Sequence, residues 1–101
     1  MDKDAVREVE KLLGKIELDI EKAILFGSRA RGDYLKHSDV DLILVSEDFK
    51  GVDWTERGKR FYLQWEGEQP LEILCYTPEE FEKKKNMIGT VKTAAEEGIE
   101  I

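Results

Sequence analysis

The chain has 101 residues, 41% hydrophobic and 39% charged, and a net charge of −7. This length is typical of one domain, residues 1–101, with a core of limited size, and the acidic balance disfavours non-specific binding to nucleic acid. The single cysteine and single histidine exclude an internal disulfide and a cysteine-rich or histidine-rich metal site.

The N-terminal segment is charged and lacks the apolar core of a secretory signal. No apolar run in the chain approaches the ~18 residues of a membrane-spanning helix. We therefore expect a reduced, cytoplasmic protein with no membrane partner.

The first elements follow from the spacing of the apolar residues. Residues 4–13 place them on one helical face, and Gly14 is expected to end that helix. Residues 16–20 alternate in polarity and could begin a strand or lead into one. Residues 23–26 then form a short apolar run that predicts a buried strand.

A glycine turn and a second strand come next. Ser28 is expected to cap a short helix that runs to about Arg31 and ends at Gly32. Residues 39–45 predict a strand that begins with Asp39 and Asp41 and is apolar on both faces beyond them. Such a strand is typical of the centre of a sheet.

Residues 53–65 predict one helix, with Asp53 and Glu56 as its capping box. Its four aromatic residues lie at helical spacing, and core packing is favoured over base stacking for all of them: Trp54, Phe61, Tyr62 and Trp65.

The C-terminal third predicts a strand, two helices and a short extension. Residues 71–76 form the strand, and Thr77, Pro78 and Glu80 are a typical helix start. A last helix is expected from the spacing of four apolar residues and should end at Gly98: Ile88, Val91, Ala94 and Ala95. Residues 99–101 could add an edge strand. Alternating helices and strands predict an α/β (α+β) fold with a small mixed sheet flanked by helices.

Asp39 and Asp41 are the first candidates for chemistry. At positions i and i+2 of a strand, their carboxylates project from the same face, ~7 Å apart along the backbone. Two such anions repel each other unless a cation lies between them, and Mg²⁺ with phosphates suits oxygen ligands of this kind. The simpler interpretation is that Asp39 and Asp41 are solvated residues at the start of a strand and bind no ligand.

The turn at Gly27 and Ser28 is the second candidate. Glycine lets the backbone approach a ligand closely, and the hydroxyl and the amides that follow could hold phosphate. An ordinary capped turn is the alternative. If the two flanking strands are antiparallel neighbours, the turn lies beside Asp39 and Asp41.

Glu72 is the best candidate for a third carboxylate. It opens the third strand, and the intervening helix predicts a parallel crossover that brings both strand starts to one edge of the sheet. The alternative is an exposed glutamate with no role in the site.

Together these features resemble a known family. The motif FGSRARG, followed by SDVDL with ten residues between Ser28 and Asp39, resembles the minimal nucleotidyltransferases, a branch of the DNA polymerase beta superfamily. The resemblance covers nearly the whole chain and implies the polymerase-beta-like nucleotidyltransferase fold. Glu72 is a departure, because the third acid of the family is more often aspartate.

The resemblance implies metal-dependent transfer of a nucleoside monophosphate, AMP from ATP, to a hydroxyl. Asp39, Asp41 and Glu72 would be the catalytic metal ligands for two Mg²⁺ ions. The turn of Gly27 and Ser28 would hold the phosphates. Arg29 and Arg31 would neutralise phosphate charge or pair with acids such as Asp33. His37 is expected to be a bystander in a loop.

The hydroxyl group that accepts the AMP is expected to belong to another protein. Minimal nucleotidyltransferases are often paired with a HEPN-domain toxin and act as its antitoxin by adding AMP to it. Two alternatives stay open: a catalytically weak antitoxin or adaptor that only binds nucleotide or partner, and a transferase for a small molecule. The oligomeric state, homomeric or heteromeric, is open as well.

Overall fold

The computed structural model describes residues 1–101. Its elements, in chain order, are α1 (Lys3–Gly14), β1 (Lys22–Phe26), α2 (Ser28–Arg31), β2 (Val40–Val45), the 3-10 helix η1 (Glu47–Phe49), α3 (Trp54–Arg57), α4 (Lys59–Gln64), β3 (Leu71–Tyr76), α5 (Pro78–Lys85), α6 (Thr90–Glu97) and β4 (Ile99–Glu100).

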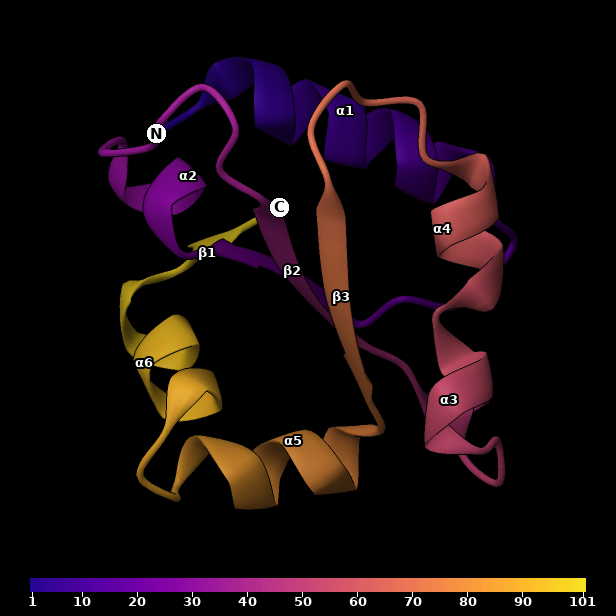
Figure 1. Cartoon of the computed structure of the whole chain (residues 1–101). Coiled ribbons are helices and arrows are strands. Elements are labelled where there is room, and N and C mark those ends of the chain that lie inside the picture. The colour runs from indigo at the N-terminus through magenta and orange to yellow at the C-terminus, as the bar shows by residue number, and fades with distance from the viewer.

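The four strands form one mixed sheet in the order β3-β2-β1-β4 (Figure 1). β1 runs antiparallel to both β2 and β4, whereas β2 and β3 are parallel. Asp41 is central to the register, because it pairs with Phe26 of β1 on one side and with Glu72 of β3 on the other. The predicted α/β fold with a small mixed sheet is therefore confirmed.

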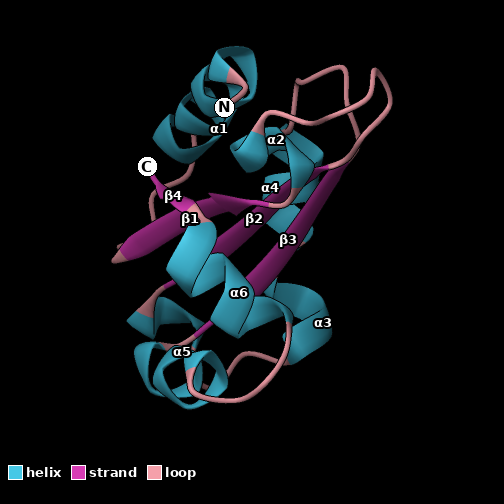
Figure 2. Ribbon diagram, turned by 90° about the vertical axis from the view of Figure 1, so that its left-hand side faces the viewer, coloured by secondary structure: helices cyan, strands magenta, loops and turns pink.

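Helices cover both faces of the sheet, and β2 contributes to both cores. Leu42 and Leu44 pack with apolar residues of α1 and α4, whereas Ile43 and Val45 pack with residues of α5 and α6. Figure 2 shows α1 and α5 on opposite sides of the strands. A shift of β2 by one residue would bring the Asp41 carboxylate to the buried position of Val40 or Leu42, which is costly for a charged group, so the start of β2 is held in a fixed place.

Local capping explains where α1 and α5 begin. Asp2 is the N-cap of α1, and its side chain accepts hydrogen bonds from the backbone N–H groups of Asp4 and Ala5. Thr77 and Glu80 form the predicted capping box of α5, with Pro78 at the first helical position.

The predicted helix over residues 53–65 is wrong in two respects. It is broken at Gly58 into α3 and α4, and Asp53 makes no side-chain capping bond. Phe61 is buried, but Trp54 and Tyr62 are about half exposed, so the four aromatic residues do not share one buried face.

Residues 16–20 belong to no strand and lead from α1 into β1, so the second of the two alternatives for this segment is confirmed. The expectation for Ile88 is wrong. Ile88 is exposed and lies before α6, which packs on the sheet through Val91 and Ala94. The predicted C-terminal edge strand is present as β4. None of the helices combines the length and the apolar character that crossing a membrane requires.

Candidate active site

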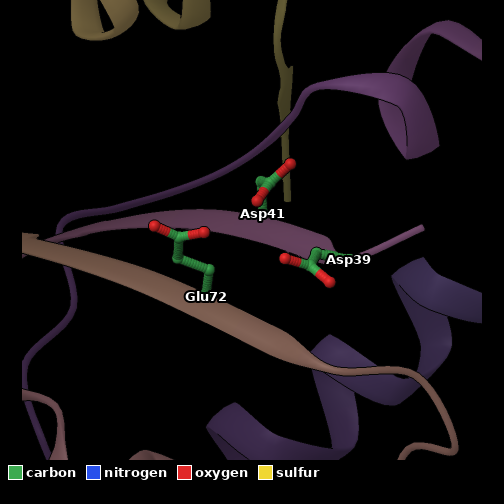
Figure 3. Close-up of side chains that lie close together, drawn as sticks. All are labelled: Asp39, Asp41 and Glu72. Atoms are coloured by element: carbon green, nitrogen blue, oxygen red, sulfur yellow. The ribbon is translucent and has the colours of Figure 1, made fainter. Parts of the chain in front are cut away.

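Three carboxylates converge at one end of the sheet. Asp41 and Glu72 are partners in the parallel register, and Asp39 precedes Asp41 by two residues. Carboxylate oxygens of all three lie within 4.8 Å of one another, and Figure 3 shows the side chains turned toward a common point. The structure thus brings together the three acids that strand order predicted. We call them the acidic cluster.

The electrostatics of the cluster centre on Asp41. Its partial burial, and then the charges of Glu72 and Asp39, raise its pKa from 3.8 to about 6. A raised carboxylate pKa means that the ionised form is disfavoured in this environment. A cation bound between the three carboxylates would offset that repulsion.

The donor set fits Mg²⁺. All three side chains offer oxygen ligands only, and hard divalent cations prefer such ligands. Mg²⁺ is commonly bound by one or two carboxylates together with substrate phosphates, so an open group of carboxylates at the end of a sheet suits it. Asp39, Asp41 and Glu72 are the residues of this chain that could hold the ion.

Gly27 lies directly against the cluster. Its backbone has φ 75° and ψ −157°, a conformation that is essentially restricted to glycine. A β-carbon at this position would lie 2.5 Å from Oδ2 of Asp41. The turn therefore approaches the Asp41 carboxylate as closely as only glycine permits.

Ser28 is placed differently from the prediction. It is the first residue of α2, whereas Gly27 occupies the N-cap position, and no side-chain capping bond is made there. The helix ends as predicted, at Gly32 in the left-handed conformation. The Ser28 hydroxyl is therefore not committed to capping α2.

Arg29 does not suit the predicted contact with phosphate. Its side chain is only 4% exposed, and Nη1 lies 2.8 Å from Oδ2 of Asp2. The guanidinium also donates to the carbonyl oxygens of Leu35, Lys36 and Ser38. Arg29 thus holds the segment that leads into Asp39, and it acts on the cluster by positioning that segment.

Sequence reasoning missed this role because Asp2 and Arg29 are 27 positions apart. The only local signal was the position of Asp2, which stands just before the helically spaced apolar residues of α1 and is therefore an N-cap candidate.

Arg31 remains at the surface. Its Nε lies 3.3 Å from Oδ1 of Asp33, which agrees with the predicted alternative of a pair with this acid. Both side chains are more than half exposed, so the pair is weak and Arg31 can turn toward an anion. His37 is exposed in the loop before Asp39.

A cavity of 310 Å³ lies between α2 and α6, beside the glycine turn. It is lined by residues from both helices and from the end of β1: Phe26, Gly27, Ala30, Arg31, Thr90, Thr93, Ala94, Glu97 and Gly98. The sequence predicted α6 from its apolar residues alone, and nothing in its spacing showed that its polar residues would face the turn.

A glycine turn beside converging carboxylates on a mixed sheet defines the class of the protein. The sequence matches the nucleotidyltransferase domain family over residues 6–100. The chain therefore belongs to this family, as its motifs had suggested.

Two curated relatives come from one organism. Two proteins of Methanocaldococcus jannaschii, each named "putative protein adenylyltransferase", are 48% identical over 50 residues and 50% identical over 46 residues. These matches cover 48% and 44% of this chain, and 50% and 46% of the relatives, so the chain spans about half the length of the curated relatives it matches.

A solved structure from Sulfolobus solfataricus, described as a "putative nucleotidyltransferase", superposes with a TM-score of 0.57. It is 29% identical, and the match covers 82% of this chain and 72% of that chain.

Proposed function

We propose that this protein is a Mg²⁺-dependent nucleotidyltransferase that transfers AMP from ATP to a hydroxyl group of a partner protein. The observation that carries the proposal is the acidic cluster, whose three carboxylates lie within 4.8 Å of one another beside the glycine turn. Membership of the nucleotidyltransferase domain family supports the same reaction class.

In the proposed reaction, the acceptor oxygen attacks the α-phosphorus of ATP. The bond from that phosphorus to the bridging oxygen of the β-phosphate breaks, and pyrophosphate leaves while the acceptor proton is released. Mg²⁺ held by the cluster would neutralise developing charge and favour ionisation of the acceptor hydroxyl.

The residues of the chain have separate tasks in this proposal. Asp39, Asp41 and Glu72 hold the cation. The glycine turn lets phosphate oxygens approach the backbone because Gly27 carries no side chain, and the Ser28 hydroxyl donates a hydrogen bond to them. Arg31 leaves its exposed partner Asp33 and neutralises phosphate charge.

The acceptor in this proposal is a HEPN-domain toxin, and the chain acts as its antitoxin. The resemblance to minimal nucleotidyltransferases suggests this partner, and the names of the two Methanocaldococcus relatives support a protein as acceptor.

The test is transfer of label from α-³²P-ATP to a HEPN-domain protein encoded beside this chain. Label should appear on the partner in the presence of Mg²⁺ and should be absent with EDTA. Asp39→Asn should abolish the transfer, because it removes a ligand from the cluster. The matched control is Asp53→Asn, since Asp53 is an exposed acid that makes no side-chain capping bond. Transfer that persists in Asp39→Asn would overturn the proposed mechanism.

A binding module without chemistry is the second candidate, and Glu72 is the observation that favours it. The longer side chain replaces the aspartate more common in the family, and this changes the distance between the strand and the ligand oxygens. If the chain binds ATP and the HEPN-domain protein but transfers no label, this second function replaces the first.

A further inference from the structure

The cavity between α2 and α6 adjoins the acidic cluster on the side of β1. Phe26 pairs with Asp41 across β1 and β2, so their side chains lie on the same face of the sheet. Phe26 and Gly27 both line the cavity, and Gly27 contacts the Asp41 carboxylate. A molecule bound to the cluster and the turn would therefore have this cavity as its immediate neighbour.

The walls of the cavity differ in character from the cluster. Phe26, Ala30 and Ala94 supply apolar surface, while Thr90 and Thr93 supply hydroxyl groups. An apolar wall with a few polar groups is typical of a small-molecule site. The volume of 310 Å³ is near the lower end of the usual ~300–1,000 Å³ for ligand pockets, so it fits a nucleoside better than a protein segment.

Two opposite charges line the cavity. The Glu97 carboxylate disfavours phosphate and accepts hydrogen bonds from hydroxyl or amino groups, whereas Arg31 is the side chain that the proposed function assigns to phosphate charge. Phosphates belong at the cluster and the glycine turn, where a cation and backbone amides can compensate their charge.

We propose that this cavity receives the nucleoside part of the donor nucleotide. In this arrangement Phe26 and Ala94 contact the base or sugar, and Thr90, Thr93 and Glu97 hydrogen-bond to its polar groups. This inference rests on the proposed function, because it assumes a nucleotide whose phosphates lie at the acidic cluster.

One consequence concerns the acceptor. Asp41 lies between Phe26 of β1 and Glu72 of β3. With the nucleoside on the β1 side, the acceptor hydroxyl reaches the α-phosphate from the β3 side, next to Glu72. The departure from aspartate at position 72 then affects the acceptor side of the site, and the α2–α6 cavity is unaffected by it.

The experiment compares binding of ATP and of inorganic tripolyphosphate, each with Mg²⁺, by calorimetry. Thr93→Trp places a large ring in the cavity from an exposed position on α6, without changing the buried residues. We expect it to weaken ATP binding about tenfold or more and to leave tripolyphosphate binding unchanged. The matched control is Lys92→Trp, an exposed position on the same helix that does not line the cavity, which should bind both ligands like the unchanged protein.

A second variant does not depend on how α6 tolerates tryptophan. Glu97→Ala removes one polar contact from an exposed position and should also weaken ATP binding selectively. Equal affinities for ATP in the unchanged protein and in both variants would overturn the inference and leave the proposed function standing. An equal loss of ATP and tripolyphosphate binding would also overturn it, by assigning the cavity to phosphates. If the unchanged protein binds neither ligand, the proposed function itself fails.

Discussion

Gly27 is the residue on which the geometry of the site depends most directly. It has a backbone conformation essentially restricted to glycine, and its α-carbon leaves no room for a methyl group beside Asp41. The residue therefore serves the backbone turn and the acidic cluster at once, and the two roles can be separated by substitution.

Gly27→Ala should lower the free energy of unfolding by about 1–3 kcal/mol, the usual cost of a strained backbone. The new methyl group should also displace the Asp41 carboxylate and weaken Mg²⁺-dependent ATP binding. Denaturant titration and calorimetry measure the two effects. Gly51→Ala is the control, because Gly51 also has a positive φ, of 77°, but a β-carbon there meets open space. It should lose stability without losing ATP affinity, and a Gly27→Ala variant that binds ATP normally would contradict the account.

Asp41 should make stability depend on pH. Its pKa is about 6 in the folded protein and 3.8 ordinarily, so the folded state retains a proton that the unfolded chain releases. Stability should therefore fall as pH rises through this range, and the cost should be complete above pH 6. Because Asp41 is partly solvated, we expect a cost of about 1 kcal/mol, well below the unscreened value.

The measurement is urea unfolding at pH 4, 6 and 8 in EDTA. Asp41→Asn should be more stable than the unchanged protein at pH 8, because it removes the charge that burial and the two neighbouring carboxylates disfavour. The difference should disappear at pH 4, where Asp41 is protonated in the fold. Equal stabilities at pH 8 would argue against repulsion within the cluster. Asp53→Asn, outside the cluster, is the control.

Arg29 should act through position and not through contact with substrate. Its guanidinium is buried against Asp2 and three carbonyl oxygens. Arg29→Met should destabilise the protein by about 3 kcal/mol, because it leaves the Asp2 carboxylate unpaired. A double-mutant cycle with Asp2→Asn should show that the two losses are not additive. Additive losses would mean that the pair has no energetic role.

At the scale of elements, α3 and α4 protect the exposed edge of β3. Figure 1 shows both helices beside this edge strand. The Tyr62 hydroxyl accepts a hydrogen bond from the Ile73 N–H at 2.8 Å, and Arg57 donates to the Cys75 carbonyl at 3.2 Å. Side chains thus occupy backbone groups that would otherwise be free to pair with another strand.

Replacing both side chains should open this edge. Tyr62→Phe removes the acceptor for Ile73 and should cost about 1 kcal/mol. Arg57→Lys removes the paired contact with Glu80, whose pKa the guanidinium and the Thr77 bonds hold at about 2. That contact stabilises the fold above the ordinary pKa of 4.5, and its contribution is lost as pH falls toward 2.

The double variant should therefore unfold at a lower temperature near pH 7 and should self-associate in size-exclusion chromatography. Arg60→Lys serves as the control, since Arg60 is an exposed residue of α4. A double variant that stays as stable and as monodisperse as this control would show that the edge needs no such protection.

The helices and strands also show how much of the fold local sequence signals can predict. The strands and α5 were predictable, because apolar runs and a capping box are signals within a few residues. The break at Gly58 was not, because a glycine inside a helical pattern often continues the helix. Ser28 was misplaced because Gly27, with a positive φ, takes the N-cap position of α2, and no local signal distinguishes the two residues.

At the scale of the whole molecule, β2 organises the site. It is buried on both faces and positions Asp41 between β1 and β3, while Asp39 directly precedes it. The convergence of Asp39, Asp41 and Glu72 was predictable, because a parallel crossover aligns the two strand starts. The cavity beside Gly27 was not, because it depends on how α6 packs against a turn some sixty residues earlier in the chain.

The proposed function requires a metal-dependent nucleotide site at the acidic cluster and the glycine turn. The decisive measurement is titration of ATP into the unchanged protein and into Asp39→Asn, each with Mg²⁺ and with EDTA. We expect binding only by the unchanged protein in Mg²⁺. ATP binding of equal affinity in EDTA, or in the Asp39→Asn variant with Mg²⁺, would contradict it.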